Sequence, residues 1–235
     1  MLREALEWIS EHSKPKLEEI GGLTYSSKNL NLITKPMASP LKVSTLSGFV
    51  DYICNDPDTE VEPPTQPFVL IEPARVSLVR PLMCDTRQRE KLLVAEPHPI
   101  GRWIEDQYLP AEDFNIMLQS CCLDTKHRDQ LLSVCGHLAE QSEVSTADDG
   151  VSQKTTVKTG IQRMDNKDVP NPVTLQPFCT FNEVQQPERP FVVRMRSDRG
   201  IQIMLTPCDG GAWKNKAIEN IHTYLKERID LQIIS

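Results

Sequence analysis

The chain has 235 residues and a formal net charge of −7, and hydrophobic residues make up 39% of it. These values are typical of a soluble globular protein with one large domain or two small ones. The negative charge argues against a general DNA-binding protein, and the absence of any run of about 18 apolar residues argues against a membrane-spanning helix.

The N-terminal part is predicted to mix helices with short strands. Leu2, Leu6 and Ile9 recur at helical spacing and predict an amphipathic helix over 2–12. A hairpin that turns at Gly21-Gly22 is expected next. A second helix follows over 44–56, with Ser44 or Thr45 as its N-cap, and it ends at an acidic, proline-rich loop.

The middle of the chain is predicted to form two strands and then two adjacent helices. The strands lie within "FVLIEPARVSLVRPL" and "EKLLVAEPH", and the helices within "PAEDFNIMLQSCC" and "KHRDQLLSVCGHLAE". Beyond residue 140, hairpins are predicted at Asp148-Asp149-Gly150 and at residues 198–200, with "VTLQPFCTF" between them. A helix over 212–229 follows, and "LQIIS" is compatible with a last strand.

This order of elements predicts an α+β fold rather than repeated βαβ units. We expect a mainly antiparallel sheet with an N-terminal helix, a central helix pair and a C-terminal helix. We take 1–235 as a single domain. A subdivision near residue 140, into 1–140 and 141–235, stays open.

No motif of a known catalytic class occurs in the chain. The five histidines are scattered without zinc spacing, and no G-x-S-x-G, P-loop or G-x-G-x-x-G sequence is present. The seven cysteines form no C-x-x-C pair, which predicts reduced thiols in a cytoplasmic protein. We therefore predict no cofactor and no metal. A non-enzymatic protein is favoured over an enzyme, which stays open as an alternative because the fold could assemble a Cys/His pair.

Residues 151–216 contain more Lys and Arg than Asp and Glu, which would suit an anion site in an acidic protein. At its start, Lys154 and Lys158 share one strand face and could contact phosphate, or could simply protect an edge strand. Asp148 and Asp149 could bind a cation, but Asp-Asp-Gly is also what a tight hairpin requires.

The segment "VPNPVTLQPFCTFNEVQQPERPFVVRMR" mixes aromatic and basic side chains. Such a mixture suits stacked bases with neutralised phosphates. The aromatic members are Phe178, Phe181 and Phe191, and the basic ones are Arg189, Arg194 and Arg196. The alternative is a core strand with a charged outer face, because Arg194 and Arg196 share one parity while Val193 and Met195 share the other.

The stretch "CDGGAWK" precedes the last predicted helix. Free N–H groups at a helix start can bind an anion, and Lys214 could assist them. Asp209, however, would repel a second negative group. We favour a strand-to-helix turn over a ligand loop and keep Asp209 and Lys214 as candidates.

Several segments resemble the YfdQ-like family of uncharacterised phage and prophage proteins. They are "DDGVSQKTTVKTGI", "VTLQPFCTFNEVQQP" and "DGGAWKNKAIENIHTYL", and the opening "EALEWISEHSKPKLEEIGGLTYSSKNL" resembles the Firmicute-phage branch. Cys179 stands where the family pattern leads us to expect arginine. The resemblance implies a phage-encoded protein in the bacterial cytoplasm, encoded among early genes that include recombination and counter-defence functions, and it transfers no catalytic residue.

Two functions follow as hypotheses. The first is a non-enzymatic binding protein that antagonises host antiviral defence by binding a host defence protein or a small anionic nucleotide. The second is an accessory to phage DNA recombination or replication, as a single-strand binder or a ring around DNA, which the acidic charge disfavours. A homo-oligomer is compatible with both, and no membrane partner is expected.

Overall fold

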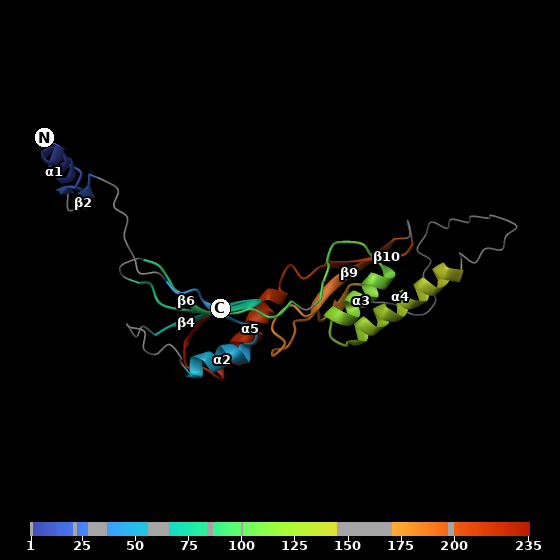
Figure 1. The fold of residues 1–235 in the computed structure, drawn as a ribbon. Helices are drawn as coiled ribbons and strands as arrows, with labels where there is room; N and C mark the ends of the chain where they lie inside the picture. The colour runs from blue at the N-terminus through green and yellow to red at the C-terminus, as the bar shows by residue number, and fades with distance from the viewer. Residues whose placement is uncertain are drawn as a thin grey trace. The chain divides into compact units, whose positions relative to one another are not determined.

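The computed structural model describes residues 2–20, 23–27, 37–55, 66–83, 87–99, 101–144, 171–196 and 200–235 (Figure 1). Contacts divide the chain into two compact units. Unit 1 comprises residues 1–38 and 82–88, and unit 2 comprises residues 39–81 and 89–235. The predicted subdivision near residue 140 stays a prediction, and the predicted hairpin at residues 148–150 lies outside the described residues.

Unit 1 contains a helix and a hairpin. Helix α1 spans Leu2–His12, and strands β1 (Leu17–Ile20) and β2 (Leu23–Ser26) pair antiparallel. Ile20 pairs with Leu23, so two residues connect the strands. The N-terminal helix and the first hairpin are therefore confirmed.

Unit 2 contains a five-stranded sheet in the order β11-β4-β5-β6-β3. Its central strands are antiparallel, whereas each edge strand runs parallel to its neighbour. Two helices belong to the same core, α2 (Leu46–Asn55) and α5 (Trp213–Lys226). The strands are β3 (Leu41–Val43), β4 (Phe68–Glu72), β5 (Arg75–Val79), β6 (Lys91–Ala95) and β11 (Gln232–Ile234).

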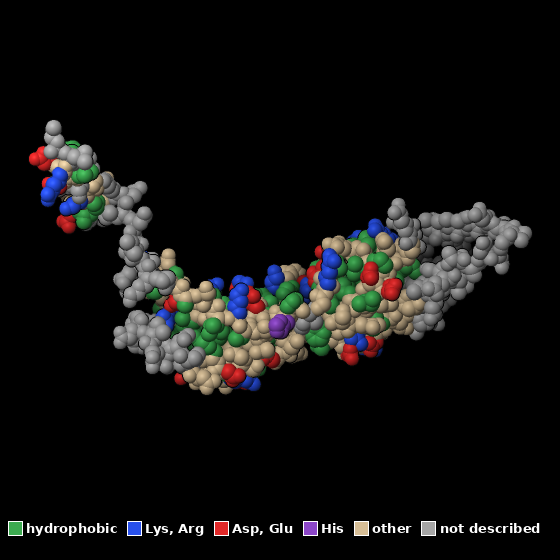
Figure 2. Space-filling view, viewed as in Figure 1, with side chains coloured by type: hydrophobic (Ala, Val, Ile, Leu, Met, Phe, Trp, Pro, Cys, Tyr) green, Lys and Arg blue, Asp and Glu red, His purple; other side chains and the backbone are tan. Residues whose placement is uncertain are grey.

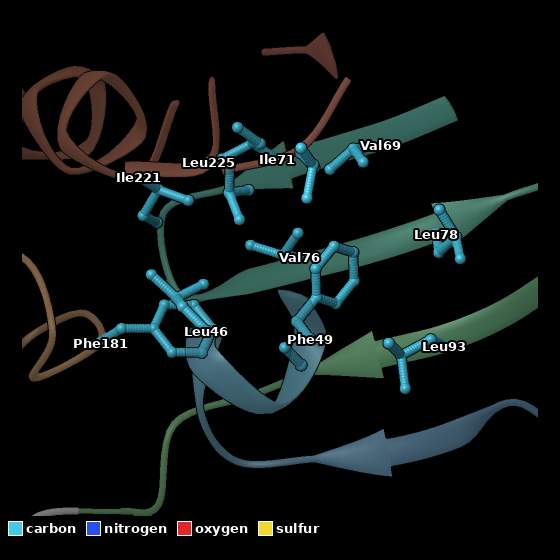
Figure 3. Close-up of a cluster of buried hydrophobic side chains, with 12 residues drawn as sticks. Leu46, Phe49, Val69, Ile71, Val76, Leu78, Leu93, Phe181, Ile221 and Leu225 are labelled. Atoms are coloured by element: carbon cyan, nitrogen blue, oxygen red, sulfur yellow. The ribbon is translucent and has the colours of Figure 1, made fainter. Parts of the chain in front are cut away.

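The core of this sheet lies between the strands and the two helices, as Figure 3 shows. Side chains of alternate residues on β4, β5 and β6 point to one face. Phe49 from α2 and Ile221 from α5 pack onto that face, and both are fully buried. Phe181 reaches the same cluster from the segment before β9, so residues far apart in the sequence share this core.

A second, four-stranded sheet has the order β7-β10-β9-β8 and is antiparallel throughout. Helices α3 (Ala111–Cys121) and α4 (Lys126–Val144) cover one of its faces (Figure 1). Its strands are β7 (Leu109–Pro110), β8 (Val173–Leu175), β9 (Arg189–Arg196) and β10 (Gln202–Pro207). The core between sheet and helices includes Phe114, Leu131, Phe191 and Leu205.

The predicted α+β class with its N-terminal, central and C-terminal helices is confirmed. Two features differ from the detailed expectations. The parallel edge pairs β11–β4 and β3–β6 were not predicted, because strands so distant in sequence leave no local signal. Strand β8 is limited to Val173–Leu175, and the rest of "VTLQPFCTF" is irregular backbone apart from one bridge between Cys122 and Pro177.

The irregular segment before β9 is held by the side chain of Gln186, which is 3% exposed. Its Oε1 accepts hydrogen bonds from the backbone N–H groups of Cys179 (3.0 Å) and Thr180 (3.2 Å), and its Nε2 donates to the carbonyl of Phe181 (2.9 Å). One buried amide therefore satisfies three backbone groups that no regular strand pairs. This explains how an irregular segment can lie in the interior.

The same segment also stabilises the start of α2. The carboxylate of Glu183 accepts hydrogen bonds from the N–H groups of Leu46 (2.9 Å) and Ser47 (2.8 Å). Oγ1 of Thr45 accepts from the N–H of Gly48 at 3.0 Å, which confirms Thr45 as the capping residue. Three of the N–H groups that a helix start leaves unpaired are thus satisfied, and two of them are bound by Glu183, which is 137 positions from Leu46 and 136 from Ser47.

Candidate functional site

The outer face of the β9–β10 hairpin is the candidate site. Along β9, Val193 and Met195 pack against the core between this sheet and helices α3 and α4, while Arg194 and Arg196 are exposed on the other side. Across the hairpin, Arg194 pairs with Met204 and Arg196 pairs with Gln202. Directly opposed residues of an antiparallel pair lie on one face, so these four side chains share a surface. This confirms the predicted parity of the strand.

Arg196 is held in place on this surface. Its guanidinium lies 3.9 Å from the ring centroid of Tyr108, and its Nε donates a hydrogen bond to Oε1 of Gln202 at 2.8 Å. Tyr108 precedes β7, which pairs with β10 through Gln202 and Ile203. A guanidinium stacked on an aromatic ring loses less conformational entropy when it binds a carboxylate or phosphate.

We call this surface the open face and define it by Tyr108, Val192, Arg194, Arg196, Gln202 and Met204. No residue of this set is acidic, and none of the other outward residues of β9 and β10, which are Pro190 and Thr206, is acidic. Both guanidinium groups belong to side chains that are exposed on this face. Tyr, Met and Arg are enriched in protein–protein interfaces, whereas Lys and Glu are depleted there.

The open face differs in shape from a ligand pocket. A groove of about 300 Å³ lies elsewhere, along α5 and residues 183–185, and it includes Lys216, Glu219, Tyr224 and Arg228. Its charges are mixed. In Figure 2, basic and acidic side chains are interspersed over the visible surface and do not merge into a continuous basic band.

The loop "CDGGAWK" is a strand-to-helix turn closed by its own aspartate. Oδ1 of Asp209 accepts a hydrogen bond from the N–H of Gly211 (3.1 Å), and Oδ2 accepts from the N–H of Trp213 (3.4 Å). Gly210 and Gly211 have positive φ angles of 58° and 83°, which explains the two glycines. The anion position at the start of α5 is thus occupied by Asp209, as the turn interpretation requires.

Asp209 also belongs to a buried ionic network around Arg189, whose side chain is 6% exposed. Nη1 of Arg189 lies 2.6 Å from Oε1 of Glu105 and Nη2 lies 3.3 Å from Oε2, so this pair is bidentate. Nε of Arg189 lies 3.7 Å from Oδ2 of Asp209, too far for a hydrogen bond. The guanidinium also stacks on the rings of Phe191 (4.9 Å) and Trp213 (5.0 Å).

The remaining sequence candidates do not assemble with the open face. Lys214 is exposed in the first turn of α5, which follows the end of β10 at Pro207. Pro207 pairs with Phe191, and Phe191 is five positions along β9 from Arg196, so Lys214 lies near the opposite end of the hairpin from Arg196. Lys154, Lys158, Asp148 and Asp149 lie outside the described residues. Among the described candidates, Arg194 and Arg196 lie together on the open face, whereas Asp209 and Lys214 belong to the start of α5.

The aromatic residues of the predicted nucleic-acid segment mostly face inward. Phe181 and Phe191 are fully buried in the two cores, and Phe178 is half-buried. A base cannot stack on a ring that the core already covers. Of the aromatic–basic mixture, Arg194 and Arg196 are exposed, and the guanidinium of Arg196 lies on the ring of Tyr108.

Six cysteines lie in the described ranges as free thiols, and three of them, Cys121, Cys122 and Cys135, are buried. Burial raises the pKa of Cys122 and of Cys179 to about 11 each and the pKa of Cys135 to about 12. These thiols are protonated at neutral pH, which is opposite to a nucleophilic cysteine. In the described part of the chain, no three His, Cys, Asp or Glu side chains form a group that could hold a metal ion.

Sequence reasoning missed Tyr108, Gln202 and Met204 on the open face. Gln202 and Met204 could have been found by counting outward from the turn of the predicted hairpin, because they oppose the two arginines. Tyr108 precedes a two-residue strand with no periodic signal. The pairing of Glu105 with Arg189 spans 84 positions and has no local signature either.

Among the helices in the described ranges, none combines the length and apolar character needed to cross a bilayer. Comparison with known proteins found no matching family model, no matching curated protein and no matching solved structure.

Proposed function

We propose that this chain is a non-enzymatic binding protein that docks through its open face on an acidic surface of another protein. One observation carries the proposal. Arg194 and Arg196 project together, both exposed, from one sheet face, and Arg196 is stacked on Tyr108. Tyr108 and Met204 add apolar area beside them. Arginine and tyrosine are the side chains that most often dominate binding energy at protein interfaces.

A protein partner fits this geometry better than a small nucleotide does. Pockets for small ligands typically enclose about 70–90% of the ligand surface. A face formed by alternate side chains of two paired strands offers no such enclosure, and the groove along α5 has mixed charge. A broad partner surface, in contrast, can cover the whole face and desolvate both guanidinium groups.

The resemblance to phage proteins supports a partner in the bacterial host. Within the proposal, the protein acts in the host cytoplasm, early in infection, and occludes a component of antiviral defence. The exposed arginines would provide orientation and association rate through charge complementarity. No chemistry is required of the chain for such a role.

The test compares affinities of two charge-matched variants. The double variant Arg194→Glu/Arg196→Glu changes the open face, and Lys214→Glu/Lys226→Glu makes the same charge change on exposed residues of α5. Proteins captured from host lysate by the wild-type chain are identified and purified, and their binding is titrated by calorimetry. We expect the open-face variant to lose at least about 30-fold in affinity, the loss of a hot spot of about 2 kcal/mol, and the α5 variant to bind normally.

Three results would contradict the proposal: equal binding by both variants, loss with the α5 variant alone, or a partner without an acidic surface. Single-stranded nucleic acid is the alternative, favoured by the stack of Arg196 on Tyr108. Fluorescence anisotropy with single-stranded DNA at low salt tests it. Salt-sensitive binding that Tyr108→Ala abolishes would replace the protein partner with this alternative.

A further inference from the structure

Strand β9 is covered by β8 along only part of its edge. The register pairs Val173 with Phe191 and Leu175 with Arg189, so β8 covers the first residues of β9. β9 continues to Arg196, and β10 lies on its other side. Within the described ranges, the last residues of β9 therefore form an edge of the sheet. Such an edge is a template for pairing with another chain.

The side chain of Asn171 shows which backbone groups face this edge. Its Nδ2 donates a hydrogen bond to the carbonyl of Val193 (3.2 Å), and its Oδ1 accepts one from the N–H of Val193 (3.1 Å). One amide thus exchanges two hydrogen bonds with one residue, which is the pattern of a hydrogen-bonded pair between antiparallel strands. The Asn171 side chain therefore stands where a residue of an antiparallel strand would stand, and both bonds are exposed at the surface.

Met195 is the next residue whose backbone faces the same edge. In an antiparallel ladder, the N–H and C=O groups of alternate residues point to the same side, so those of Met195 point the same way as those of Val193. Arg194, between them, faces β10 and pairs with Met204. In the part of the chain that the structure describes, the pairs of β8 and the bonds of Asn171 all lie before Met195. Met195 thus offers one donor and one acceptor to an added strand.

We propose that an extended acidic segment of the partner protein adds to β9 as an antiparallel strand at Met195. This inference rests on the proposed docking function and names the form of the partner at the same surface. The residue opposite Met195 exchanges two hydrogen bonds with it and lies on the same face of the sheet. Its two neighbours lie opposite Arg194 and Arg196, in non-hydrogen-bonded pairs, whose side chains approach most closely.

The side chains of β9 determine the sequence that such a segment needs. Arg194 and Arg196 are exposed on the open face, so carboxylates at alternate positions of the added strand meet both guanidinium groups. Opposite charges in directly opposed pairs stabilise a sheet, whereas like charges destabilise it. Met195 points to the other face and packs against the core, so the residue between the two carboxylates is apolar. In strand addition, main-chain bonds give affinity and alternate side chains give specificity.

Fluorescence anisotropy with a labelled decapeptide of alternating glutamate and valine tests the proposal. We expect the wild-type chain to bind it and Arg194→Glu/Arg196→Glu to bind at least about 30-fold more weakly, which is the loss of a hot spot. Lys214→Glu/Lys226→Glu should bind like the wild-type chain. A decapeptide with the same residues in two blocks controls for charge alone, and equal binding of this peptide would overturn the proposal.

N-methylation of the peptide tests the edge contact itself. The valine opposite Met195 directs its amide toward β9, whereas the glutamates on either side direct theirs away. We expect methylation of the valine amides to weaken binding at least about tenfold, because it removes donors and blocks the edge. Methylation of the glutamate amides should leave binding nearly unchanged. Equal effects of the two methylations, or no binding of the unmodified peptide, would refute the added strand.

Amide hydrogen exchange measured by NMR reports on the protein side of the same contact. With the unmodified peptide bound, the N–H of Met195 should exchange more slowly, whereas the N–H of Arg194, which faces β10, should not change. An unchanged Met195 would also refute the added strand.

The inference and the proposed function can fail separately. A captured partner that binds Arg194→Glu/Arg196→Glu weakly, together with a peptide that does not bind, would retain docking on the open face and reject strand addition. A captured partner that binds this variant normally would reject both.

Discussion

Replacement of Arg189 by alanine should destabilise the protein strongly. The change removes a guanidinium that is 6% exposed and leaves the carboxylates of Glu105 and Asp209, 26% and 7% exposed, without their cation. Breaking a buried ion pair from one side typically costs about 3–5 kcal/mol. We expect about 3 kcal/mol here, because water can reach Glu105 and because Asp209 keeps two backbone N–H donors.

Urea denaturation followed by tryptophan fluorescence measures this loss, since Trp103 donates to Glu105 and Trp213 stacks on Arg189. Arg189→Ala removes both the packing of the side chain and the charge that the carboxylates need. Arg189→Met separates these two losses, because methionine restores apolar packing but leaves the carboxylates without a cation. The double variant Arg189→Met/Glu105→Gln should be more stable than Arg189→Met alone, since it removes one unpaired charge.

Arg196→Ala is the matched control on the same strand. Its guanidinium is exposed, so we expect a loss of less than about 1 kcal/mol. If Arg189→Ala cost no more than Arg196→Ala, the network would contribute little to stability. Our interpretation that the ionic network of Arg189, Glu105 and Asp209 stabilises the contact between β9 and the start of α5 would then be wrong.

Three further outcomes are expected. Glu183→Ala should lower the melting temperature, because it removes two hydrogen bonds at the start of α2 that are worth about 1 kcal/mol. Glu188→Ala, which replaces another exposed glutamate of the same segment, should not. Gly211→Ala should cost about 1–2 kcal/mol in denaturation, because a φ of 83° strains any side chain although space is open there. Raising the pH from about 9 toward 11 should reduce the stability of the fold. The reason is that the thiol of Cys135, whose pKa is raised to about 12, stays protonated in the folded protein but ionises in the unfolded chain. Melting temperatures measured over this pH range check the prediction, and Cys135→Ala should make them depend less on pH.

Elements with a complete local signal were predicted. The periodic apolar residues of the C-terminal helix, the two-residue connection of the first hairpin and the capping threonine of α2 each depend on neighbours within a few positions. The parallel edge strands depend on pairings with residues distant in the chain, and β3 and β11 are three residues long. Where these strands pair depends on which edge of the sheet the rest of the fold leaves open. A short stretch of sequence does not contain that information.

Asp209 shows how a correct local interpretation can still be incomplete. The pattern Asp-Gly-Gly before a helix predicted a turn, and the hydrogen bonds of Asp209 to Gly211 and Trp213 confirm it. The same pattern gave no indication that the carboxylate is buried beside Arg189. That contact needs β9 to run past the start of α5, so it is a property of the assembled fold and not of the turn.

The three arginines of β9 illustrate the same limit. They share a short strand and a basic character, and the sequence grouped them as one anion-binding set. Strand parity separates them. Arg189 has the parity of Phe191, Val193 and Met195 and therefore lies on the core side, where it needs Glu105 as a partner. Arg194 and Arg196 have the opposite parity and remain exposed. The parity of a residue decides whether its charge is buried and needs a partner inside the protein, or is exposed and can bind another molecule. Replacing Arg189 should therefore affect stability, whereas replacing Arg194 or Arg196 should affect binding.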